Sequence, residues 1–184
     1  MNIVRNVDAT KSVLLIIDLQ EKLAPAIGGF SDILTNTLKL SQASVIHNVP
    51  VLISEQYKKG LGGTLQQIKD GLPQASYFDK IYFSACAEPD FLELLKRYER
   101  PQIVVVGTEA HVCVLQTCLD LLQSGFDVFV VADAIGSRKK KHEQIAIEQL
   151  RQAGAVISCA ETVIFQWAKK AATPTFKKVL TIIK

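Results

Sequence analysis

The chain has 184 residues, a formal net charge of +3 and a composition that is 48% hydrophobic and 21% charged. These values are typical of a globular domain with a sizeable core, and they argue against a disordered chain or a nucleic-acid-binding protein. No apolar run approaches the ~20 residues that a membrane-spanning helix needs.

The cysteines and the N-terminus both bear on the cellular compartment. The four cysteines lack the paired spacing of a disulfide framework, which favours a reducing compartment. The N-terminal MNIVRNVDATKS contains no secretory apolar core. We therefore expect a cytoplasmic protein, with a short mitochondrial presequence as the alternative.

Apolar runs alternate with helical patterns along the whole chain. Strands are predicted at 12–18, 51–54, 102–106, 127–132 and 155–158, and helices at 34–48, 88–100, 112–124, 139–153, 162–171 and 176–183. The stretch 75–85 is aromatic and irregular. This alternation indicates one parallel, doubly wound, three-layer α/β domain over residues 1–184.

The first two strands each lead into polar residues. Asp18 lies at the carboxyl end of the 12–18 strand and Gln20 follows in the loop. From position alone, Asp18 is as readily a structural cap as a site residue. Gln56 precedes a glycine-rich loop, 60–63, that lacks the pattern of a phosphate-binding loop. Lys80 sits among apolar neighbours, where a snorkelling surface lysine is the simpler interpretation.

Cys113 falls where the turn after the 102–106 strand becomes a helix. The unpaired N–H groups and positive dipole of a helix start favour a thiolate there. Ligands also gather at the carboxyl ends of parallel strands. Cys113 is therefore the leading nucleophile candidate, with a buried structural cysteine as the alternative. We expect Cys86, Cys118 and Cys159 to pack as small apolar residues.

The three histidines give little support for a metal site. No HxxxH or CxxC pair occurs. His47 ends a helix and His142 falls in a basic surface turn, so both are expected to be structural. His111 lies two residues before Cys113, a spacing that rarely lets two side chains meet at a helix start.

Three motifs in this order resemble the isochorismatase-like cysteine hydrolase family. They are LLIIDLQ at Leu14–Gln20, the lysine within FDKIYFSA at Phe78–Ala85, and VVVGTEAHVCV at Val104–Val114. The likeness to the isochorismatase domain-containing subgroup is stronger still, through SEQYKKGLGGT, GTEAHVC and ETVIFQ. The resemblance implies a Rossmann-like fold with a six-stranded parallel sheet, and a catalytic triad of Asp18, Lys80 and Cys113.

The same resemblance implies a reaction. Cys113 would attack the acyl carbon of a small amide or related molecule, with Asp18 as the general base and Lys80 in an electrostatic role. The backbone amides of Glu109 and Cys113 would form the oxyanion hole. Gln20, Gln56 and His111 are candidate substrate-binding residues. A non-catalytic binding or scaffold protein and a redox-sensitive thiol protein are the alternatives.

Further expectations concern metals, assembly and one peptide bond. Nicotinamidases of this family carry an aspartate and histidines for a metal after the second strand, where this chain reads SEQYKKG. We therefore expect no metal and no cofactor, and a small-molecule substrate as partner. Family members are commonly dimers or larger, and the apolar Phe165, Trp167, Phe176 and Leu180 favour a homo-oligomer, a dimer or tetramer. The family also implies a cis peptide bond at Thr108–Glu109.

Overall fold

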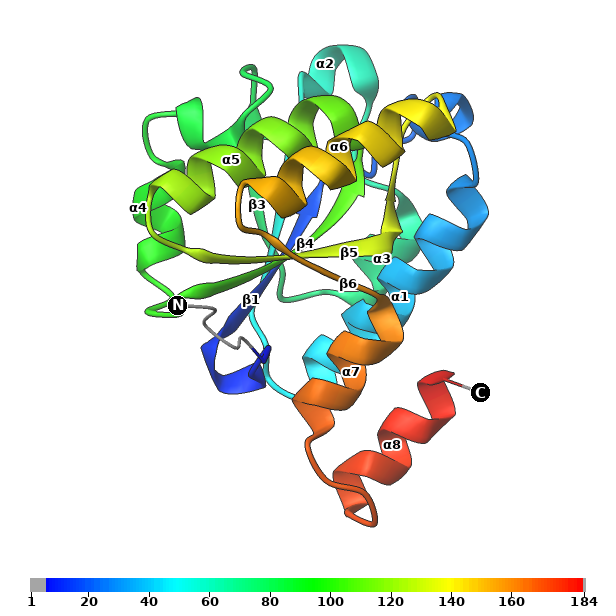
Figure 1. The fold of residues 1–184 in the computed structure, drawn as a ribbon. Helices are drawn as coiled ribbons and strands as arrows, with labels where there is room; N and C mark the ends of the chain where they lie inside the picture. The colour runs from blue at the N-terminus through cyan, green and yellow to red at the C-terminus, as the bar shows by residue number, and fades with distance from the viewer. Residues whose placement is uncertain (1–5, 184) are drawn as a thin grey trace.

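The computed structural model describes residues 6–183 and shows a six-stranded sheet between two layers of helices (Figure 1). The strands are β1 (Ser12–Ile17), β2 (Val51–Gln56), β3 (Ser76–Lys80), β4 (Gln102–Thr108), β5 (Asp127–Gly136) and β6 (Val156–Ser158). Their order is β3-β2-β1-β4-β5-β6, and every neighbouring pair is parallel. The predicted six-stranded parallel α/β fold is therefore confirmed. Residues 1–5 of the segment considered as a presequence lie outside the described residues.

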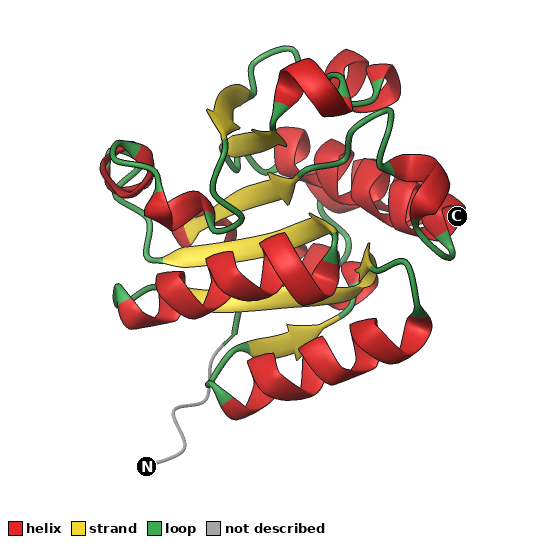
Figure 2. Ribbon diagram, turned by 90° about the horizontal axis from the view of Figure 1, so that it is seen from above, coloured by secondary structure: helices red, strands yellow, loops and turns green. Residues whose placement is uncertain are grey.

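The helices cover both faces of the sheet (Figures 1 and 2). They are α1 (Phe30–Ile46), α2 (Lys58–Leu61), α3 (Gln66–Gly71), α4 (Phe91–Lys96), α5 (Leu115–Gln123), α6 (Lys140–Gln152), α7 (Ala160–Ala168) and α8 (Pro174–Ile183). Short helical turns are η1 (Ala9–Lys11), η2 (Ala24–Ala26), η3 (Ala85–Ala87) and the π-helical η4 (Ala110–Val114). Helices α1, α3, α7 and α8 pack on one face, and α4, α5 and α6 on the other. None of these helices combines the length and apolar character that crossing a bilayer requires.

Two separate cores explain why the central strands read as unbroken apolar runs. Leu14 and Ile16 of β1 point into the core beneath α1 and α7, whereas Leu15 and Ile17 point into the core beneath α5. Both faces of each central strand are therefore buried, as parallel sheets require.

Two strands differ from the sequence-based prediction. The irregular 75–85 stretch contains β3, an edge strand in which Tyr77 and Asp79 are exposed, so it lacks the apolar run of a central strand. Strand β5 continues past residue 132 to Gly136, because its register with β4 shifts between Val105 and Gly107. An irregularity of this kind leaves no pattern in an apolar run.

The apolar residues of the C-terminal helices are largely used within the chain. Trp167 is buried and its indole N–H donates to Ser12 Oγ at 3.2 Å. Phe165 and Phe176 pack ring to ring with centroids 5.8 Å apart, and α8 packs against both α1 and α7. These helices thus give less reason to expect self-association than their sequence suggested.

Candidate active site

The ends of β1 and β3 and the turn after β4 bring the predicted triad together at the carboxyl edge of the sheet. Asp18 follows β1, Lys80 ends β3, and Cys113 lies in η4 after β4. Gln56 ends β2, the strand between β1 and β3. The order of connections reverses between β1 and β4, which is where open α/β sheets form their ligand sites.

Asp18 and Lys80 form a fully buried ion pair, with Nζ 2.8 Å from Oδ2. Ser54 Oγ donates to Asp18 Oδ1 at 2.8 Å. Lys80 Nζ donates to Gln56 Oε1 at 2.6 Å and to the carbonyl of Phe83 at 3.1 Å. The ammonium is therefore surrounded by acceptors, as a buried charge requires.

Oδ2 of Asp18 retains capacity to accept a proton. Lys80 Nζ lies 2.8 Å from Oδ2 as its ion-pair partner, and that oxygen has no further hydrogen-bond partner among the described residues. The Cys113 thiol is the neighbouring donor, and its interaction with the carboxylate shifts the pKa of both groups. A buried carboxylate beside a thiol is the arrangement that a general base needs.

The surroundings of Cys113 favour the neutral thiol, the opposite direction to the thiolate expected from its place at a helix start. Its side chain is only 4% exposed. Burial first, and then the Asp18 carboxylate, raise the pKa of Cys113 to about 12, while Lys80 opposes them. Burial and a negative neighbour thus outweigh the favourable field of the helix start. Burial likewise raises the pKa of Asp18, against the lowering influence of Lys80.

The site is framed by strained backbone. Asp18 and Tyr57, which follow β1 and β2, have φ values of +52° and +38°. Gly107 has φ +134°, and a Cβ there would lie 2.0 Å from the carbonyl oxygen of Ile17. Only glycine permits this approach of β4 to β1, which lets Thr108 Oγ1 donate to the Asp18 carbonyl at 2.6 Å.

The two glutamines have different positions. Gln20 is fully buried, and its amide nitrogen donates to the carbonyls of Gln56 and Gly62 at 3.0 and 2.7 Å. Its oxygen accepts from Gln56 N at 2.8 Å. Gln20 therefore positions the loops after β1 and β2. The Gln56 oxygen, in contrast, lies 4.0 Å from Cys113 Sγ and faces the reactive group.

The turn before Cys113 differs from the expectation in one respect. All peptide bonds of the described residues are trans, Thr108–Glu109 included, so the predicted cis bond is wrong. The Glu109 carbonyl instead accepts from Val112 N at 3.0 Å and Val114 N at 3.3 Å, which closes the turn as a π-helix. A trans bond avoids the roughly 2.5–4 kcal/mol that a non-proline cis bond costs.

His111 points away from the thiol. Its Nδ1 lies 2.9 Å from Ser137 Oγ, and its ring packs against His142 with centroids 4.9 Å apart. Burial lowers the pKa of His111. His142 is half-buried in the first turn of α6 and not in a surface turn as expected. A cysteine–histidine pair is not formed.

The other cysteines divide by burial. Cys118 is fully buried, as predicted, and Cys86 is half-buried. Cys159 is exposed, which contradicts the expectation that it packs in the interior, because it is the N-cap of α7 at the protein surface. All four are free thiols.

Sequence reasoning missed several residues that support the site. Ser54 binds Asp18, and Glu55 is a buried carboxylate that accepts from Thr64 N and Thr64 Oγ1 at 2.7 and 2.8 Å. Glu55 thereby fixes the glycine-rich loop against β2. One indication of these roles was present in the sequence: Ser54 ends the predicted strand 51–54 and Glu55 follows it, where site residues gather.

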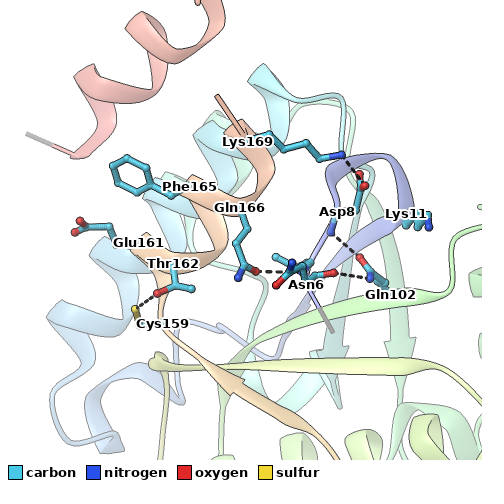
Figure 3. Close-up of a pocket in the computed structure, with 11 residues that line it drawn as sticks. Asn6, Asp8, Lys11, Gln102, Cys159, Glu161, Thr162, Phe165, Gln166 and Lys169 are labelled. Atoms are coloured by element: carbon cyan, nitrogen blue, oxygen red, sulfur yellow. Dashed lines mark hydrogen bonds and ion pairs between the residues drawn. The ribbon is translucent and has the colours of Figure 1, made fainter. Parts of the chain in front are cut away.

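A separate hollow of about 930 Å³ lies at the opposite, amino end of the sheet (Figure 3). Much of its polar lining is paired internally. Lys169 Nζ lies 2.6 Å from Asp8 Oδ2, Val7 N donates to Gln166 at 3.1 Å, and Asp8 N donates to Gln102 at 2.7 Å. This hollow therefore presents little unsatisfied chemistry. Within residues 6–183, no group of three or more His, Cys, Asp or Glu side chains is arranged to hold a metal.

The fold and site together define an α/β protein with a buried carboxylate, ammonium and thiol at the carboxyl edge of a parallel sheet. The sequence profile of the isochorismatase domain matches residues 12–162. The chain therefore belongs to the isochorismatase family.

Comparison with individual relatives and with solved structures supports the same family assignment. Isochorismatase domain-containing protein 1 of Danio rerio is 37% identical over 179 residues, covering 97% of this chain and 63% of its own. The MAR1 ribonuclease of Caenorhabditis elegans is 40% identical, with a TM-score of 0.92 over 97% of this chain and 92% of that one. The fold is shared with Escherichia coli YcaC, described as an octameric hydrolase of unknown specificity, at 23% identity and a TM-score of 0.94 over 100% and 91% of the two chains.

Proposed function

We propose that this isochorismatase-family protein is a cysteine hydrolase that acts on a small amide or related molecule through Asp18, Lys80 and Cys113. The observation that supports this proposal is the buried Asp18 carboxylate, which lies between the Lys80 ammonium, 2.8 Å from Oδ2, and the Cys113 thiol that interacts with it. Because the surroundings raise the pKa of the Cys113 thiol, the proposed attack includes transfer of its proton to Asp18.

The proposed reaction has two stages. Asp18 takes the thiol proton as Sγ bonds to the acyl carbon, and then gives that proton to the departing amine, leaving a thioester. Asp18 next takes a proton from water as the hydroxyl attacks the thioester, and the sulfur leaves and regains the proton. Lys80 stabilises negative charge on Asp18 whenever the carboxylate is free.

The oxyanion formed in each stage needs donors. We propose the backbone amide of Cys113, within η4, and that of Glu109, which directly precedes η4, for this role. Losing one such donor typically lowers the rate by ~10²–10³. Metal participation is not part of the proposal, since the residues around Gln56 offer no ligand set. Exhaustive chelation should therefore leave turnover unchanged.

The substrate is proposed to be small because Cys113 is only 4% exposed. A relative is called a ribonuclease, yet a polynucleotide backbone reaches so deep a sulfur less readily than a small amide does. The buried thiol with its raised pKa also argues against a redox sensor, which needs an accessible thiolate.

A panel of small amides, esters and single-stranded RNA tests the proposal, with purified wild-type protein and Cys113→Ala. Hydrolysis of an amide or ester by the wild type alone, with a thioester adduct visible by mass spectrometry, is the expected result. Equal turnover by Cys113→Ala would reject the nucleophile. Absence of turnover with every amide and ester would favour a non-catalytic binding protein.

A homo-oligomer in the cytoplasm completes the proposal. Four free thiols suit a reducing compartment, and YcaC, which shares the fold, is described as octameric.

A further inference from the structure

The Lys80 ammonium depends on a loop whose side chains are mostly exposed. Its Nζ donates to the carbonyls of Phe83 and Tyr82 at 3.1 and 3.4 Å. The side chains of Ile81, Tyr82 and Phe83 are 67%, 59% and 55% exposed, so they contribute little buried apolar surface. The loop also leaves the sheet from β3, an edge strand with one neighbour. A segment with so few buried contacts opens readily unless hydrogen bonds fix it.

The near end of this loop is tied to β2 and to itself. Gln56 Nε2, at the end of β2, donates to the Ile81 carbonyl at 2.7 Å. Glu88 Oε1 accepts from Ile81 N at 2.6 Å and from Tyr82 N at 3.0 Å, which closes the loop on its own later residues. These bonds shape the loop, but they do not relate it to the turn that carries the thiol.

The far end of the loop is tied to α5, beside which it lies (Figure 1). Ser84 Oγ donates to Asp120 Oδ2 at 2.5 Å, and Ala85 N donates to Thr117 Oγ1 at 3.0 Å. Ser84, Ala85 and Thr117 are buried, and Asp120 is half-buried. Because a buried amide without an acceptor is costly, the bond to Thr117 has no ready substitute.

The same helix begins at the thiol. Cys113 lies in η4, which runs directly into α5, and Thr117 and Asp120 follow it by about one and two helical turns. Side chains at this spacing lie on one side of a helix. The carbonyls that bind Lys80 are therefore tied to the helix that carries Cys113, next to the point where the triad meets.

We propose that Thr117 and Asp120 are positioning residues of the candidate site. Through the loop after β3 they hold the Lys80 ammonium at a fixed place beside Asp18 and Cys113, and neither needs to touch a substrate. A buried ammonium whose acceptors drift loses its hydrogen bonds and its fixed distance to the carboxylate. The effect on catalysis rests on the proposed function, whereas the placement of Lys80 can be measured without a substrate.

Acylation of lysines with N-hydroxysuccinimidyl acetate, followed by peptide mass mapping, measures how firmly Lys80 is held. In the wild type Lys80 should react last among the described lysines, because its side chain is fully buried. Thr117→Val keeps the size of the side chain but removes the acceptor of Ala85 N, so Lys80 should react roughly tenfold faster. Thr117→Ser keeps the hydroxyl and should restore the wild-type rate.

Gly154→Ala is the control for lost stability. It strains a left-handed residue after α6, with φ +101°, without creating a clash, and should leave the acylation of Lys80 unchanged. Equal acceleration by Gly154→Ala and Thr117→Val would mean that Lys80 is exposed by general unfolding, which would overturn the inference. If Thr117→Val does not fold, Asp120→Ala against Asp120→Asn repeats the comparison, since asparagine keeps an acceptor for Ser84 Oγ.

Kinetics with any substrate found in the panel give the second measurement. Thr117→Val should lower kcat roughly tenfold with a smaller change in KM, and Thr117→Ser should recover it. If no substrate is found, the acylation rates alone decide the inference, and only the proposed function fails. If the wild type turns a substrate over through Cys113 but Thr117→Val changes neither kcat nor the acylation of Lys80, the proposed function stands and the inference is wrong. Faster acylation with unchanged kcat would likewise reject the positioning role.

Discussion

Asp18 and Cys113 both hold a proton more tightly in this site than in water. Burial raises the pKa of each group, and each influences the other. A carboxylate with a raised pKa is a stronger base, which brings it nearer to the thiol it must deprotonate. The first predictions below follow from the raised pKa values of Asp18 and Cys113.

Cysteine alkylation should follow exposure. With iodoacetamide at neutral pH we expect Cys159 to react before Cys113, because Cys159 is exposed whereas Cys113 is buried with a pKa raised to about 12. This order reverses the one that a helix-start thiolate would give. Peptide mass mapping over time measures it. Modification of Cys113 first would show that the site holds a reactive thiolate after all.

The raised pKa of Asp18 predicts where activity fails in acid. A general base works only when deprotonated, so kcat/KM should fall as the pH drops through a pKa above the ordinary 3.8. Ser54→Ala removes a hydrogen bond that lowers this pKa, so it should move the acid limb to still higher pH. A pH–rate profile on any substrate found in the panel measures both. An unmoved limb in Ser54→Ala would assign it to another group.

Gln56 should matter through Lys80. Gln56→Leu deprives the buried ammonium of an acceptor at 2.6 Å, and an unsatisfied buried charged donor costs ~1–3 kcal/mol. If that loss falls on the transition state, kcat/KM drops by roughly tenfold to a hundredfold. Gln66→Leu is the control, since Gln66 binds only Asp70 on the surface of α3. Equal kinetics in both variants would contradict the proposed role of Gln56.

At the scale of elements, the contact between β1 and β4 depends on one missing side chain. Gly107→Ala would place a Cβ 2.0 Å from the Ile17 carbonyl in a backbone with φ +134°. Overpacking and strain together should lower the free energy of unfolding by at least about 3 kcal/mol.

Gly125 provides the matched control for that substitution. Its φ is +87°, but a Cβ there meets nothing within 4 Å. Gly125→Ala should therefore cost only the strain of a left-handed residue, roughly 1–2 kcal/mol. Urea denaturation compares the two. Similar losses in both variants would show that the close approach to Ile17 is relieved by movement of the strands.

How far the sequence predicts these elements depends on burial. The central strands were predictable because both faces are buried, which leaves an unbroken apolar run in Val13–Ile17 and Ile103–Val106. β3 was not, because Tyr77 and Asp79 face solvent at the sheet edge. Asp18, Lys80 and Cys113 could be picked out through their motifs, but the raised pKa of Cys113 could not, since it depends on burial by distant parts of the chain.

The contacts that support the site could not be predicted from the sequence either. Nothing in the local sequence shows that Ser54 binds Asp18, or that His111 turns to Ser137, because each pair is far apart along the chain. Only the order and register of the strands bring such residues together.

At the scale of the whole molecule, an ion pair joins the segment before β1 to the residue after α7. The Lys169 ammonium just after α7, together with hydrogen bonds from Thr10, lowers the pKa of Asp8 to about 2 from 3.8. The resulting stability is present above pH 3.8 and is lost as the pH falls toward 2. Because Lys169 is largely exposed, the contribution should not exceed ~1 kcal/mol.

Lys169→Met tests this contribution. The variant should be slightly less stable than the wild type at neutral pH and equally stable near pH 2, with Lys170→Met as the control for loss of a lysine charge. Urea denaturation at several pH values measures the difference. A deficit that persists at low pH would mean that packing, and not charge, joins Lys169 to the N-terminal segment.

The loop after β3 holds Lys80 by main-chain carbonyls, and its outward surface is made of side chains. Mutation exchanges side chains and leaves carbonyls in place. The residues at 81–83 are therefore free to drift over generations, altering what this surface meets, while the ammonium beneath keeps its partners. In an evolving lineage, or in a library randomised at these positions, the outward surface can change while the hydrogen bonds to Lys80 stay the same.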